Sequence, residues 1–189
     1  MKWEDYKANA MRTFAHNNSI NEDDELFNKK INELHCVIGI STEIGEFIQA
    51  IENNDRVNAT EEIGDIFWYT ANLERLVVPT GLSFPYDEKG ITVFADEFLV
   101  SIQNLVDIYK KAVFYGSDID YEKVLWYIKE IKKTCVGMLS MNDINPEDVM
   151  ETNIKKLAIR YPEKFKREDA EQRDLFAERK VLEDGNSNI

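Results

Sequence analysis

An all-α fold of about five long helices is the architecture that this sequence predicts, and three observations predict it. Glycine (8) and proline (4) are scarce among the 189 residues, so turn signals are few and regular segments are long. Apolar residues recur at three- and four-residue spacing along these segments, which is the period of an amphipathic helix. The alternating patterns and two-residue turns typical of β-hairpins are missing from the sequence. We therefore expect an antiparallel helical bundle.

The first three predicted helices occupy the amino-terminal part of the chain. Residues 3–15 carry aromatic and alanine side chains at helical spacing, and a polar stretch follows them. A long helix is expected over residues 25–53, and the next over residues 58–78. Asn58 precedes Glu61 by three residues, which is the spacing of an N-terminal cap. The second and third helices should therefore form an antiparallel hairpin.

Three further helices are expected beyond a connection that contains two prolines. They span residues 93–114, 120–139 and 146–161. Pro146 marks the start of the last one, because proline suits the first turn of a helix.

The length favours a single domain with a small appendage. We expect residues 1–165 to form the helical domain. Residues 166–189 are highly charged and should form a helical arm that ends in a disordered tip.

The overall composition excludes several classes of function. A net charge of −13 opposes tight binding to nucleic acid, which clustered basic residues drive. No run approaches the ~18 apolar residues of a membrane span, and the first residues lack the apolar core of a secretory signal. The expected location is therefore the cytoplasm, without a membrane or nucleic-acid partner. The two cysteines are predicted to be reduced, buried thiols.

Two short acidic motifs are the most informative feature. Glu43 and Glu46 lie three residues apart, and so do Glu62 and Asp65, so each pair shares one side of its helix. At ~1.5 Å rise per residue, both pairs stand roughly 6–15 Å from the turn between their helices. In an antiparallel hairpin the four carboxylates should face one another.

A cluster of this kind requires compensation. Both pairs are flanked by isoleucines and aromatic residues, and carboxylates in an apolar stripe are costly unless a cation is present. Four oxygen ligands suit Mg²⁺. Two solvated acidic helix faces are the alternative interpretation. Gly45 and Gly64 precede the second acid of their motifs, either to admit a ligand or a close helix, or simply to ease packing.

Candidate cationic and polar partners for a phosphorylated substrate lie elsewhere. Asn153, Lys156 and Arg160 follow one side of the helix at 146–161, and Lys110 closes the helix at 93–114. Lysine offers a point charge to phosphate and arginine a bidentate fork. Asn72 lies two helical turns after Asp65. Ordinary solvated lysines and a buried amide are the alternative interpretations of these residues.

Several segments together resemble the MazG-like all-α nucleoside triphosphate pyrophosphohydrolases, and the resemblance extends over roughly residues 1–165. The segments are Gly39-Ile-Ser-Thr-Glu43-Ile-Gly-Glu46, Glu61-Glu62-Ile-Gly-Asp65-Ile-Phe-Trp68-Tyr69, Lys110-Lys111-Ala-Val-Phe-Tyr-Gly and Asn153-Ile-Lys-Lys156-Leu-Ala-Ile-Arg160-Tyr161-Pro162.

The resemblance implies a site and an assembly. Glu43, Glu46, Glu62 and Asp65 would bind Mg²⁺, for which Mn²⁺ could substitute, and Asn153 and Lys156 would contact phosphates. A homodimer or homotetramer is implied. The chain departs from the pattern of many members at position 42, where Thr42 replaces an acid, while Glu61 precedes the second motif.

The expected activity is hydrolysis of a ribo- or deoxyribonucleoside triphosphate to the monophosphate and pyrophosphate. Glu43 or Glu46 would act as the catalytic base. Lys110, Lys156 and Arg160 would stabilise negative charge on the phosphates, and Asn72 would contact the substrate. Two alternatives stay open: a non-catalytic helical oligomerisation or interaction protein, and the same fold acting on a phosphoribosyl nucleotide or an alarmone.

Overall fold

The structure is a computed structural model and describes residues 1–14, 24–78 and 95–186. Within these ranges the chain is all-α and contains no strand, as predicted. The helices of the described residues are α1 (Trp3–Arg12), α2 (Glu25–Glu52), α3 (Arg56–Val77), α4 (Ala95–Phe114), α5 (Tyr121–Ser140), α6 (Pro146–Arg160), α7 (Arg167–Glu171) and α8 (Leu175–Asn186).

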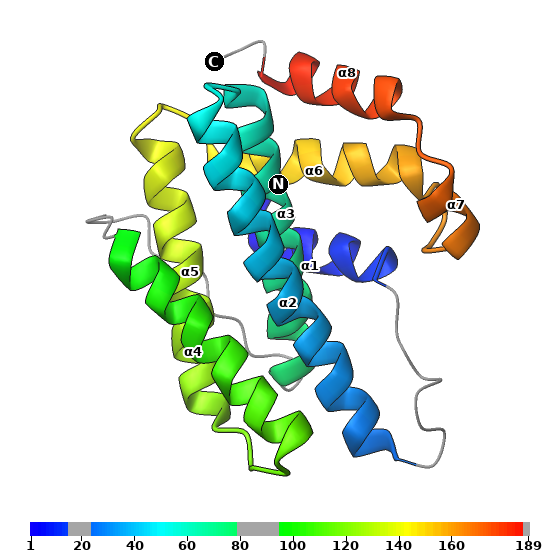
Figure 1. Cartoon of the computed structure of the whole chain (residues 1–189). Coiled ribbons are helices and arrows are strands. Elements are labelled where there is room, and N and C mark those ends of the chain that lie inside the picture. Colours follow the sequence, from blue (N-terminus) through cyan, green and yellow to red (C-terminus); the bar gives the residue numbers. More distant parts are fainter. Residues whose placement is uncertain (15–23, 79–94, 187–189) are drawn as a thin grey trace.

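The helices fall into two sets with different directions. Helices α2 to α5 run lengthwise beside one another, whereas α1, α6 and α8 lie across them (Figure 1). The predicted fifth member of the bundle, α6, crosses α3 rather than extending the row, so a five-helix antiparallel bundle is not confirmed. This crossing brings the carboxyl-terminal helices α6 and α8 against α3.

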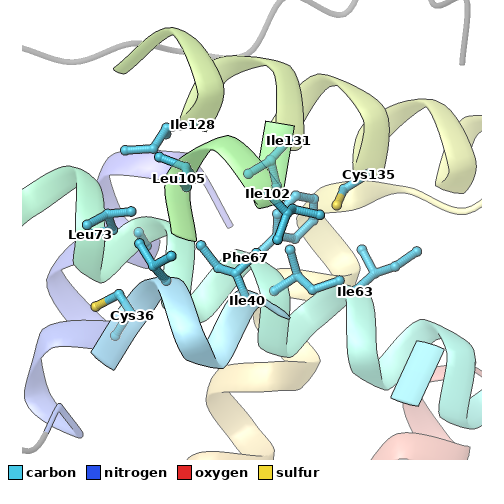
Figure 2. Close-up of a cluster of buried hydrophobic side chains, with 14 of the residues drawn as sticks. Cys36, Ile40, Ile63, Phe67, Leu73, Ile102, Leu105, Ile128, Ile131 and Cys135 are labelled. Carbon is cyan, nitrogen blue, oxygen red and sulfur yellow. The ribbon is translucent and has the colours of Figure 1, made fainter. Parts of the chain in front are cut away.

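One apolar core joins the lengthwise helices. Ile40 of α2, Phe67 of α3, Leu105 of α4 and Ile131 of α5 are buried and point toward one another (Figure 2). Burial of each such side chain contributes roughly 1.5–3 kcal/mol. The core thus fixes α2 and α3 side by side at the level of the acidic motifs.

Aspartate caps set the starts of three helices. Asp24, Asp55 and Asp120 each accept a hydrogen bond from the backbone N–H three residues later. The expected cap at Asn58 is wrong, because Asp55 caps α3 and Asn58 donates the capped N–H, at 3.0 Å. An acidic side chain nearer the turn therefore starts α3 earlier than predicted.

A buried ion cluster holds α1 on the core. The carboxylate of Glu74 is fully buried and lies 2.9 Å from Nζ of Lys7 and 2.6 Å from Nζ of Lys132. The indole N–H of Trp3 donates to the same carboxylate at 3.3 Å. Burial lowers the pKa of Lys132, and the charge of Glu74 opposes that effect. Because these residues come from α1, α3 and α5, the cluster joins three helices.

The predicted arm contains α7 and α8, and its last residues, 187–189, lie outside the described part of the chain. Helix α8 packs along α6: Leu182 is buried, and a Cβ at Gly185 would lie 2.5 Å from Oγ1 of Thr152. A side chain at this glycine would push the two helices apart.

Among the described helices, α2 has the length and apolar composition to cross a membrane. The core helix of a soluble protein and a signal sequence share these properties.

Candidate functional site

Three of the four predicted acids meet between α2 and α3. Glu43, Glu62 and Asp65 each offer a carboxylate oxygen, and these oxygens lie within 4.8 Å of one another. Glu46 is exposed and is not a member of this group. Three residues advance a helix by roughly 300°, so Glu46 is turned about 60° away from Glu43.

The electrostatics of this acid cluster (Glu43, Glu62 and Asp65) call for a cation. Burial, and then the negative charge of Asp65, raise the pKa of Glu43 and raise that of Glu62 further. A side-chain hydrogen bond joins Glu62 and Glu43 and adds to the raised pKa of Glu62. Two neighbouring carboxyls with raised pKa values mark a site short of positive charge. The donor set is all oxygen, which fits a hard divalent cation such as Mg²⁺.

Helix α6 provides the partners of Asp65. Nζ of Lys156 lies 2.8 Å from Oδ1 and 2.6 Å from Oδ2 of Asp65, and 3.1 Å from Oε1 of Glu61. The amide nitrogen of Asn153 donates to Oδ1 of Asp65 at 2.6 Å. Both side chains are buried. They were predicted to contact phosphates, and in this structure both bind Asp65.

A glycine and a tyrosine allow this approach of α6. A Cβ at Gly64 would lie 3.2 Å from Cβ of Asn153, tighter than ordinary contact. The hydroxyl of Tyr6 donates either to the carbonyl oxygen of Gly64, at 3.0 Å, or to Oδ1 of Asn153, at 2.8 Å. Gly64 therefore serves close helix packing. Gly45 has no neighbour within 4 Å of its added Cβ among the described residues.

A cavity of about 160 Å³ opens beside the acid cluster. Glu43, Asp65 and Arg160 contribute charged groups to its wall, and the rest is largely aromatic. The aromatic side chains are His35, Trp68, Tyr69, Tyr161 and Phe165.

Close packing fixes this aromatic wall. The rings of Trp68 and Tyr69 meet edge to face at 4.8 Å, and His35 lies 5.8 Å from Tyr69. A Cβ at Gly39 would fall 2.3 Å from the Tyr69 ring. Any larger residue at position 39 would displace this tyrosine, so Gly39 lets Tyr69 lie directly over α2.

Arg160 lies in the cavity wall and forms an ion pair with Glu178. Its Nε lies 3.0 Å from Oε1 of Glu178, and its Nη2 lies 2.5 Å from Oε2. Arg173 donates to the same carboxylate at 2.7 Å. Burial would raise the pKa of Glu178, but the two arginines outweigh it and lower the pKa to about 2.

Two predicted substrate contacts have other partners. Lys110 is exposed on α4 and pairs with Asp107 at 2.6 Å. Asn72 is fully buried, donates to the carbonyl oxygen of Trp68 at 2.9 Å, and leaves its Oδ1 without a partner in the described part of the chain. Neither residue is among those that line the cavity.

Tyr6 and Glu178 were missed by sequence reasoning. Both act through contacts with residues more than fifteen positions away, so no spacing within one helix indicates them. The sequence offered one indication that Glu61 belongs to the site, namely its position directly before the second acidic motif.

Comparison with known proteins agrees with this geometry. Residues 32–80 match the family model of the MazG nucleotide pyrophosphohydrolase domain. This range contains all four predicted acids and confirms the MazG-like resemblance there, over a shorter stretch than residues 1–165. No curated protein and no solved structure gave a significant match.

Proposed function

We propose that this chain, which carries a MazG nucleotide pyrophosphohydrolase match over its paired acidic helices, hydrolyses nucleoside triphosphates to nucleoside monophosphates and pyrophosphate. The observation that carries the proposal is the convergence of Glu43, Glu62 and Asp65 inside the matched segment. Both ribo- and deoxyribonucleotides are candidate substrates.

Mg²⁺ is the proposed cofactor, with Mn²⁺ as a substitute. The acid cluster would hold it, with Glu46 able to join through its exposed carboxylate. A bound divalent ion supplies positive charge that neutralises the phosphates and acidifies water. Lys156 and Asn153 keep Asp65 fixed for this role, so their contribution to binding phosphate is indirect.

Glu46 is the proposed general base. It lies one turn beyond Glu43 on the same helix but stands outside the acid cluster and is exposed. Its carboxylate can therefore accept a proton from a water molecule that attacks the substrate, while the other acids stay in place. Glu43 is the alternative base.

The cavity beside the cluster is proposed to receive the nucleoside. Aromatic rings offer flat apolar surfaces to a base, and the charged wall at Asp65 and Arg160 places the phosphates toward the metal. Arg160 would contribute positive charge that binds the phosphates.

A homodimer or homotetramer is also proposed. Ile38, Ile48 and Ile51 of α2 are exposed at 50%, 42% and 54%. Such side chains on the helix that carries the acids support burial against another copy. Light scattering coupled to size-exclusion chromatography would detect the assembly, and a monomer at micromolar concentration would contradict it.

The decisive experiment is a panel of ribo- and deoxyribonucleoside triphosphates incubated with the protein and Mg²⁺, with separate assays for pyrophosphate and phosphate. We expect pyrophosphate release that EDTA stops. Asp65→Asn and Glu62→Gln should abolish turnover, while the matched exposed controls Asp118→Asn and Glu52→Gln keep it. Release of phosphate alone, or full activity in Asp65→Asn, would refute the proposal.

A further inference from the structure

We propose that Glu178 is a positioning residue for the substrate: it holds the guanidinium of Arg160 in the cavity wall so that Nη1 binds a phosphate of the nucleotide. This inference rests on the proposed function. It makes α8, which lies outside the segment matched by the family model, a part of the substrate site.

The pairing leaves one edge of the guanidinium available. The carboxylate of Glu178 accepts hydrogen bonds from Nε and Nη2 of Arg160 in a bidentate pair. Nη1 makes no hydrogen bond to any described residue. Because the guanidinium is planar and rigid, fixing one edge also fixes the direction of the other. Arg160 lines the cavity that Glu43 and Asp65 also line.

The negative charge of the acid cluster explains why the Arg160 guanidinium needs a second residue to fix its position. The acid cluster lies in the same cavity wall, and the charge of Asp65 already acts on the Arg160 guanidinium. A mobile arginine would be drawn to these carboxylates and would compete with the metal ion. Glu178 offers a carboxylate on the other side, so the positive and negative groups of the site stay apart.

Glu178 is itself firmly held. It is 2% exposed, lies in the first turn of α8, where a negative charge is favourable, and has Arg173 as a second partner. Buried Leu182 and the close contact of Gly185 with Thr152 fix α8 against α6. The trio of Glu178, Arg160 and Arg173 carries a net charge of +1, which suits a phosphate.

The test compares Glu178→Gln with the control Glu183→Gln. Glu183 is exposed on the same helix and pairs with Arg179 at 2.9 Å, away from Arg160. Three quantities are measured: kcat and KM for a nucleotide that the wild type hydrolyses, the Kd of inorganic pyrophosphate by calorimetry, and the rise in Tm on addition of Mg²⁺.

We expect Glu178→Gln to raise KM and the pyrophosphate Kd about tenfold, with kcat within about twofold and an unchanged Mg²⁺ effect on Tm. The control should match the wild type. Arg160→Gln should show a similar loss, and the double variant should be no worse than Arg160→Gln, because the two residues act as one unit.

Three results would overturn the inference: unchanged or tighter pyrophosphate binding in Glu178→Gln, additive losses in the double variant, or a fall in Tm with unaltered KM and Kd. A wild type that binds pyrophosphate but hydrolyses no nucleotide would refute the proposed function alone, and the Kd comparison would still decide the role of Glu178. A wild type that neither binds pyrophosphate nor hydrolyses a nucleotide would refute both the proposed function and the role of Glu178.

Discussion

Lys156 places its ammonium nitrogen within 2.8 Å of both carboxylate oxygens of Asp65, deep in the contact between α6 and α3. The same nitrogen reaches Glu61 at 3.1 Å, so one cation serves two acids. Asp65 is thereby fixed from one side and faces Glu43 and Glu62 on the other. This lysine supplies part of the charge balance to which a metal ion would add.

Replacement of this lysine should be costly. Lys156→Met leaves Asp65 and Glu61 without their cation, and breaking a buried pair typically costs about 3–5 kcal/mol of unfolding free energy. Urea denaturation measures the loss. Lys155→Met, an exposed neighbour paired with Glu151, should change the unfolding free energy by less than about 0.5 kcal/mol. Equal effects at the two positions would show that Lys156 has no special role.

The two motif glycines should respond in opposite ways to alanine. At Gly45 the added methyl meets nothing within 4 Å in the described structure, so Gly45→Ala should stabilise α2 by about 1 kcal/mol. At Gly64 the methyl would press on Asn153, which Tyr6 and Asp65 hold in place, and overpacking of this kind costs about 1–3 kcal/mol. We therefore expect a net loss for Gly64→Ala.

Thermal unfolding with and without Mg²⁺ would measure both glycine effects. Gly64→Ala should also weaken the stabilisation by Mg²⁺, because Asn153 holds Asp65. A stabilised Gly64→Ala variant with a normal Mg²⁺ response would contradict the close-packing role.

The metal-free protein should lose stability as the pH rises. The pKa values of Glu43 and Glu62 are raised above their ordinary value by burial and by Asp65. The folded state then binds more protons than the unfolded state, so the free energy of unfolding falls between about pH 5 and pH 9. Mg²⁺ binds the deprotonated acids, so its stabilising effect should grow over the same range.

Urea titrations of the wild type and of Glu62→Gln, in EDTA and in Mg²⁺, would test this pH dependence. The variant should show a flatter pH profile in EDTA and little stabilisation by Mg²⁺. Parallel profiles for the two proteins would exclude Glu62 as the titrating group.

The ion cluster under α1 gives a prediction independent of function. Glu74→Gln removes the buried carboxylate that Lys7 and Lys132 share. Lys7 then keeps only the exposed Glu4 as an ion-pair partner and Lys132 keeps its contact with the Trp3 ring, so the unfolding free energy should fall by about 3–5 kcal/mol. Glu130→Gln removes the partner of partly exposed Lys133 and should cost under about 1 kcal/mol. Chemical denaturation of both variants provides the measurement.

The sequence predicted the helices well because each depends on local periodicity. The long helix expected over residues 25–53 is α2, Glu25–Glu52, and the one expected over residues 93–114 is α4, Ala95–Phe114. The cap of α3 was misplaced because Asn58 and Asp55 are both capping residue types and spacing alone favoured the wrong one. The direction of α6 was not predictable, because it depends on the Gly64 contact across 89 positions.

The acid cluster was predictable for the same reason, since two helical spacings and one short turn define it. The residues that surround the acid cluster were not predictable from the sequence. The spacing of Asn153 and Lys156 placed them on one side of α6, but it contains no information about Asp65, which turned out to be their partner. Glu178 lies in a segment whose charges look like ordinary solvated residues until α8 is seen against α6.

The first helix supplies no ligand, yet the hydroxyl of Tyr6 lies between the backbone of α3 and the amide of Asn153. Any shortened version of the protein that begins after this helix would keep every acid of the cluster and still lose the hydroxyl that positions Asn153 beside Asp65. Fusion partners and cleavage sites placed near the start of the chain thus deserve the same care as substitutions within the site itself.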